Sequence, residues 1–130
     1  MTACGVWPTS RGLVAVLVDS ADRARSLSVA DTDNPRWALS QHLAQVGADL
    51  VIDETLLEHD RIAHAALRAG ITVWIAGPPL VASLRAAAGL ARRGARPSAA
   101  LLARLPAIPW LRSLLRRLEP PDDERQISLL

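Results

Sequence analysis

The sequence predicts an α/β fold built on a mixed sheet of five strands, and three observations support this prediction. The N-terminal part holds three Val- and Leu-rich runs that are separated only by short turn-like stretches. After these runs, apolar residues at helical spacing alternate with two short apolar segments. The 130 residues are 50% hydrophobic and 22% charged, so one ordinary domain has enough core to fold without disulfides or metal.

The three N-terminal runs, residues 3–7, 13–18 and 25–30, are expected to be consecutive antiparallel strands. Their connections are too short for a parallel return, which needs a crossover of about a dozen residues or more. In the third run, Arg25 and Leu27 alternate with serines, a pattern typical of an edge or half-exposed strand.

The rest of the chain is expected to alternate helix and strand. Asp33-Asn34-Pro35 has the side-chain cap and first-turn proline of a helix start, and Gly47 is placed to end that helix. Two buried strands, over residues 50–52 and 71–76, flank a second helix. Right-handed crossovers would place these two strands in parallel beside the antiparallel ones. The remaining predicted helices cover residues 80–93, 98–105 and 110–118.

Three antiparallel strands followed by β-α-β-α, with trailing C-terminal helices, make up the ribonuclease H-like arrangement. We therefore expect a ribonuclease H-like core over residues 1–93. An Arg-rich helical extension would follow over residues 94–118, and residues 119–130 would form an acidic, disordered tail.

Charge is strongly segregated along the chain. Residues 1–84 carry six Arg and nine acids, whereas residues 85–117 carry eight Arg and no acid. Such a segment produces a local positive field that suits the phosphate backbone of DNA or RNA, or an acidic protein. The alternative is that these arginines only solvate the outer faces of helices. The candidate nucleic-acid-binding residues are Arg85, Arg92, Arg93, Arg96, Arg104, Arg112, Arg116 and Arg117.

Several segments resemble a known family. Leu50-Val51-Ile52-Asp53-Glu54, Asp60-Arg61 and Leu67-Arg68-Ala69-Gly70-Ile71 are similar to the N-terminal ribonuclease H-like domain of DEDD-type transposases. This insertion-sequence family includes the Piv-like invertases and the bridge-RNA recombinases. The resemblance covers residues 4–105 and implies a DNA-cutting domain in which four acids bind divalent metal.

Three of the four acids that this resemblance implies are absent. Trp7 follows Cys4-Gly5-Val6 where the family has its first aspartate, and Ala95 and Ser98 stand where it has its last two acids. Glu54 remains, with Asp53 beside it, and neighbouring side chains on a strand point to opposite faces. A two-metal site needs oxygen ligands that converge from several elements. We therefore expect a degenerate domain without enzymatic activity, metal or cofactor, in which Asp53 and Glu54 are residual acids.

A second resemblance leads to a different class of function. Residues 48–68, Gly70-Ile71-Thr72-Val73 and the helix after Pro79 are similar in outline to the small domains that carry the iron–molybdenum cofactor in nitrogenase biosynthesis. That family has a histidine-bearing loop between its first two strands, where this chain has only residues 8–12. A metallocluster or small-ligand carrier is therefore the alternative function.

A self-associating structural module is a third interpretation. An apolar stripe at helical spacing on the last predicted helix would either pack on the body or dock a second copy as a homodimer. Trp37, Trp74 and Trp110 are expected to be core anchors, although Trp110 is also a candidate for base stacking or a partner contact. The stripe consists of Leu111, Leu114, Leu115 and Leu118.

The remaining residues indicate no further chemistry. His59 and His64, with Glu58 and Asp60, would form at most a loose metal site, and surface histidines are the alternative. The single cysteine, Cys4, is expected in the core and fits a reducing cytoplasm. No run approaches the ~20 apolar residues of a membrane helix, so we expect no membrane association.

Overall fold

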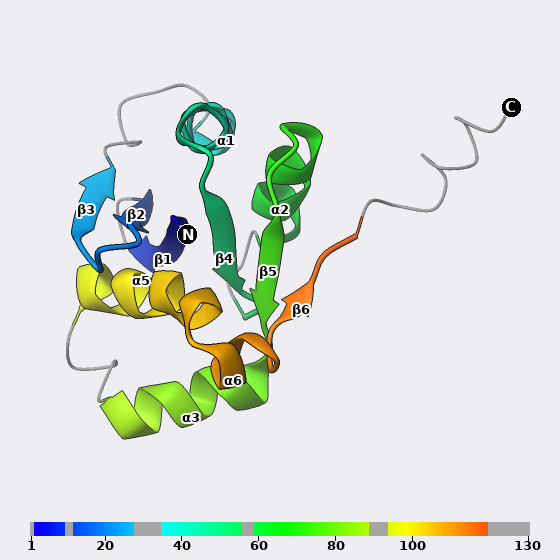
Figure 1. Cartoon of the computed structure of the whole chain (residues 1–130). Coiled ribbons are helices and arrows are strands. Elements are labelled where there is room, and N and C mark those ends of the chain that lie inside the picture. The colour runs from blue at the N-terminus through cyan, green and yellow to red at the C-terminus, as the bar shows by residue number, and fades with distance from the viewer. Residues whose placement is uncertain (1, 10–11, 28–34, 56–58, 89–93, 120–130) are drawn as a thin grey trace, which may run out of the picture.

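The structure, a computed structural model, describes residues 2–9, 12–27, 35–55, 59–88 and 94–119. One sheet of six strands has helices on both faces (Figure 1). The strands are β1 (Ala3–Thr9), β2 (Gly12–Val18), β3 (Ala24–Leu27), β4 (Asp49–Asp53), β5 (Val73–Ala76) and β6 (Arg116–Arg117). The helices are α1 (Pro35–Val46), α2 (His59–Arg68), α3 (Pro78–Ala88), α5 (Ala95–Arg104), the 3-10 turn η1 (Leu105–Ala107) and α6 (Pro109–Arg112).

The strand order β3-β2-β1-β4-β5-β6 confirms the predicted mixed sheet. β1 and β3 both pair antiparallel with β2, and β3 forms one edge of the sheet, as its alternating pattern predicts. β4 lies parallel to β1 and to β5, so α1 and α2 are the connections that return the chain to the same end of the sheet. The sequence therefore predicts the mixed sheet and the directions of its first five strands, and the structure adds their order.

The C-terminal segment differs from the predicted helix over residues 110–118. α6 is a single turn, and the chain then runs along the free edge of β5 as β6. The backbone N–H of Leu118 donates to the carbonyl of Val73 at 2.9 Å. The predicted leucine stripe is accordingly wrong, because Leu111 and Leu115 pack on one face of the sheet and Leu118 packs on the other. The pairing of β6 with β5 satisfies backbone N–H and C=O groups on the edge of β5. A helix over residues 110–118 would leave these groups to solvent.

Alternation along the strands divides the core between the two faces. Leu50 and Ile52 pack under α1 and α2, whereas Val51 packs under α3, α5 and α6. Cys4 is fully buried on the α1 and α2 side, as predicted, and this burial raises the pKa of its thiol to about 12. Within the described residues, no helix has the length and apolar character needed to cross a bilayer.

The expected domain boundaries stay predictions. The proposed junction between residues 93 and 94 borders residues 89–93, and most of the acidic tail falls on residues 120–130. Both of these segments lie outside the described residues. α5, which follows the junction, packs directly on β1 and β2 through its small side chains Ala99, Ala100 and Ala103.

A close approach between α5 and β1 occurs at Gly5. A Cβ atom at this position would lie 2.9 Å from the backbone nitrogen of Ala103 and still closer to the carbonyl oxygen of Ala99. Both obstacles are helix backbone, which cannot swing aside as a side chain can. Gly5 therefore allows the helix to rest on the strand.

We predict that Gly5→Ala lowers the free energy of unfolding by about 3 kcal/mol, because the added methyl forces α5 away from β1. Gly77→Ala is the matched control, since a Cβ there meets only ordinary contacts at 3.6 Å and 3.9 Å. The control should change stability by no more than about 1 kcal/mol. Urea denaturation of both variants measures the difference, and equal stabilities would contradict the packing described.

Candidate functional site

Asp53, one of the two residual acids, ends β4 as a buried structural carboxylate. Its side chain is on the same face of the strand as Val51, the face that α5 covers. Oδ1 accepts hydrogen bonds from the backbone N–H of Thr55 at 2.8 Å and from its Oγ1 at 2.7 Å. These bonds close the turn after β4 and satisfy an acid that burial would otherwise penalise.

Glu54 lies in different surroundings. Its backbone N–H donates to the carbonyl of Ala76 at 3.0 Å, and its Oε1 lies 3.7 Å from Nη2 of Arg116. Its Oε2 lies beside Gly77, and the side chain is 39% exposed. The two neighbouring acids therefore contact different elements, as expected for successive residues at the end of a strand.

The positions that correspond to the missing acids lie on the α5 side of the sheet. β1 and β4 are paired at Gly5 and Val51, and two residues farther along each strand are Trp7 and Asp53. Trp7 is half-buried and packs against both apolar clusters on this face. Ser98, in the N-terminal part of α5, is fully buried and donates from Oγ to the carbonyl of Gly94 at 2.7 Å.

The candidate arginines are spread over three elements. Arg96 is exposed near the start of α5, Arg112 is exposed on α6, and Arg117 is exposed on β6. Among the residues described, no carboxylate forms an ion pair with these three side chains. Arg116 is paired with Glu54, as noted above. The side chain of Arg85 and the whole of Arg92 and Arg93 lie outside the described part of the chain.

Arg104 and Arg112 are brought together in one cleft of about 520 Å³ between the β2–β3 turn and the end of α5. Nε of Arg104 donates to Oδ1 of Asp22 at 2.8 Å. The sequence predicts a turn here but not this contact, because the two residues are far apart along the chain. In the same turn, the backbone N–H of Arg23 and its guanidinium hold the pKa of Asp19 below its ordinary value.

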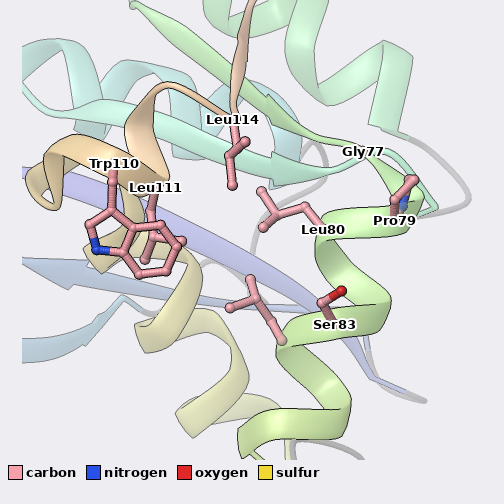
Figure 2. Close-up of a pocket in the computed structure, with 8 residues that line it drawn as sticks. Gly77, Pro79, Leu80, Ser83, Trp110, Leu111 and Leu114 are labelled. Atoms are coloured by element: carbon pink, nitrogen blue, oxygen red, sulfur yellow. The ribbon is translucent and has the colours of Figure 1, made fainter.

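An apolar groove of about 550 Å³ lies between α3 and α6 (Figure 2). Trp110, on its α6 side, is 69% exposed, so the prediction that it is a core anchor is wrong. Leu114 is 56% exposed beside it. Trp74 is half-buried and donates from Nε1 to Asp49 at 3.1 Å, whereas the side chain of Trp37 lies outside the described residues.

The histidines form no site in the described part of the chain. His64 is exposed on α2, and His42 on α1 has a buried Nε2 atom without a hydrogen-bond partner. Glu58 and the side chain of His59 lie outside that part, so the loose metal site suggested for them stays a prediction.

Comparisons with known proteins identify the fold. No family model matches the sequence, and no curated protein matches it either. Among solved structures, the chain is similar to RuvC from T. thermophilus in complex with its Holliday junction substrate. The TM-score is 0.50 at 18% identity, over 91% of this chain and 99% of that chain. The chain has a ribonuclease H-like fold. At this identity the likeness shows the fold alone.

The residues present do not fit the pair of divalent ions that the transposase resemblance implies. Asp53 is the one buried acid among those described, and its Oδ1 is occupied by Thr55. Trp7 offers no oxygen, and Ser98 uses its hydroxyl within α5. No three His, Cys, Asp or Glu side chains of the described residues come together to hold an ion. Magnesium prefers several converging oxygen ligands, which this arrangement does not supply.

We predict that Asp53 stabilises the fold and that Glu54 does not. Asp53→Ala removes two hydrogen bonds between a buried carboxylate and the turn that follows β4, and it should cost about 2 kcal/mol. Glu54→Ala removes a long, partly exposed ion pair and should cost less than about 1 kcal/mol. Thermal unfolding with and without magnesium measures both. If Asp53→Ala were instead more stable than the parent in metal-free buffer, Asp53 would be a metal ligand whose charge destabilises the fold when no ion is bound.

Proposed function

We propose that this chain is a non-cleaving ribonuclease H-like domain that binds nucleic acid through its C-terminal arginines, and that it is a degenerate relative of the DEDD-type transposases. The observation that carries the proposal is the exposure of Arg96, Arg112 and Arg117 without carboxylate partners among the described residues. Guanidinium groups in this state are available to phosphate oxygens. That RuvC, a protein of the same fold, is seen with a Holliday junction supports nucleic acid as the ligand class.

The position of these arginines also supports the proposal. α5 and α6 cover one face of the sheet, and β6 extends its edge (Figure 1). The segment from Arg85 to Arg117 carries no acid, so its field is not cancelled by its own residues. Glu54 and Asp22 each engage an arginine, Arg116 and Arg104. Among the described arginines of this segment, Arg96, Arg112 and Arg117 are left to make phosphate contacts.

We predict salt-dependent binding that the arginines control. Arg112→Gln with Arg117→Gln should weaken binding to duplex and four-way-junction DNA by about tenfold at moderate salt. It should also reduce the slope of log K against log salt by about 0.9 for each lost phosphate contact. Arg61→Gln with Arg68→Gln, an equal change of charge on α2 under the opposite face of the sheet, is the matched control. Fluorescence anisotropy over a salt series measures both quantities, and an affinity that does not fall as salt rises would contradict the proposal.

We predict no cleavage of these DNAs in the presence of magnesium or manganese. The reason is that, in the part of the chain that the structure describes, no other acids converge with Asp53 to hold an ion. Gel analysis of labelled junction and duplex substrates tests this. Cleavage by the parent chain that disappears in Glu54→Gln would show a working nuclease and overturn the degenerate assignment.

The two alternative functions, a metallocluster carrier and a self-associating module, and the cytoplasmic location stay predictions. A metallocluster carrier would contain iron or molybdenum by elemental analysis after anaerobic reconstitution. A self-associating module would show a concentration-dependent mass by light scattering. A cytoplasmic location likewise awaits a direct measurement.

A further inference from the structure

We propose that the apolar groove between α3 and α6, called here the α3–α6 groove, is a docking site for a partner protein. The occupant we infer is an amphipathic helix that presents aliphatic or aromatic side chains and is flanked by acidic residues. This inference does not depend on nucleic-acid binding. The groove is lined by Gly77, Pro79, Leu80, Ser83, Leu84, Trp110, Leu111 and Leu114.

The shape of the groove suits a helix. Leu80 and Leu84, one turn apart on α3, line one side of the groove. Trp110, Leu111 and Leu114 lie across from Leu80 on the other side (Figure 2). A partner helix that lies between two such walls can insert side chains spaced three and four residues apart.

Two residues that line the groove, Trp110 and Leu114, are unusually exposed for large hydrophobic side chains. Among the described residues, the large hydrophobic side chains that stand exposed are Val46, Trp110 and Leu114, and two of these three line the groove. Exposed tryptophan and leucine gathered in one hollow mark an interaction site more often than a free surface.

The chemistry of the walls favours a protein over a nucleobase. The hydroxyl of Ser83 and the indole N–H of Trp110 are the polar side-chain groups among the described lining residues. A base in such a groove would lose the hydrogen bonds of its edges to water and regain few of them. Aliphatic and aromatic side chains have no such requirement, so they suit the groove better.

Charge around the groove indicates an acidic partner. Arg112 follows Leu111 on α6, where its side chain lines the neighbouring cleft with Arg104. Arg117 lies three residues beyond Leu114 on β6, and both arginines are exposed. At the Gly77 end, Arg116 is held beside Glu54. A second copy of this chain would bring the same arginines against these, and like charges across an interface oppose association. The complementary occupant carries carboxylates beside its apolar side chains.

Two synthetic helical peptides test the proposal with the full chain. Both carry the same leucine and phenylalanine positions, one flanked by glutamates and the other by lysines. By fluorescence anisotropy at physiological salt, we expect the glutamate peptide to bind at least tenfold more tightly. Leu114→Gln should weaken its binding at least tenfold. Val46→Gln, which also replaces an exposed aliphatic side chain with glutamine but on α1, should change it less than twofold.

Several results would overturn the proposal. Equal binding of the two peptides, binding of neither, or binding unaffected by Leu114→Gln would each do so.

Other results would overturn it by identifying a different occupant. A dimer in light scattering that Leu114→Gln abolishes would identify a second copy as the occupant. A tenfold gain in peptide affinity on replacing Asp122, Asp123 and Glu124 with their amides would identify the chain's own acidic end. A tenfold loss of nucleic-acid affinity in Leu114→Gln would place a base in the groove. Loss of salt-dependent DNA binding alone would affect only the proposed nucleic-acid function.

Discussion

The contact of α5 with β1 at Gly5 is the constraint on which the rest of the arrangement depends. Because Gly5 has no Cβ, the backbone of Ala99 and Ala103 rests directly on the strand. A helix held this closely buries Ser98 against the sheet and brings Arg104 to Asp22. η1 then leads from α5 into α6, so the position of the α3–α6 groove and the start of β6 follow from the same contact.

This contact also explains how a ribonuclease H-like fold remains stable without an acid cluster. The sheet face under α5 is closed to water, so each buried carboxylate there needs hydrogen bonds or a cation. Asp53 accepts hydrogen bonds from Thr55, two residues farther along the chain. Trp7 and Ser98 need no counter-ion, because the indole packs on apolar neighbours and the hydroxyl bonds within its own helix. The residues at these positions are therefore stable without the metal ions that the transposase resemblance implies there.

The elements that sequence patterns predict are those whose signals are local. Short connections identify the antiparallel strands β1 to β3, and residues 50–52 and 71–76 are apolar enough to mark β4 and β5. β6 has two residues, too few for any period, and it forms only because the β5 edge is open beside it. For the candidate site, charge counting finds the arginines. Charge counting cannot predict the ion pairs Arg104–Asp22 and Arg116–Glu54, because their partners are far apart in the sequence and meet only in the folded chain.

α6 links the two proposed surfaces. It is a single turn, too short to be stable alone, so its position depends on the burial of Leu111 and Leu115. One side of this turn carries Trp110 into the groove, and Arg112 lines the cleft shared with Arg104. Trp110 and Arg112 are two residues apart on this turn, so an acidic partner in the groove and a phosphate in the cleft would approach neighbouring positions. Phosphate and an acidic helix would therefore compete for the same arginines, and the two ligands would bind as alternatives.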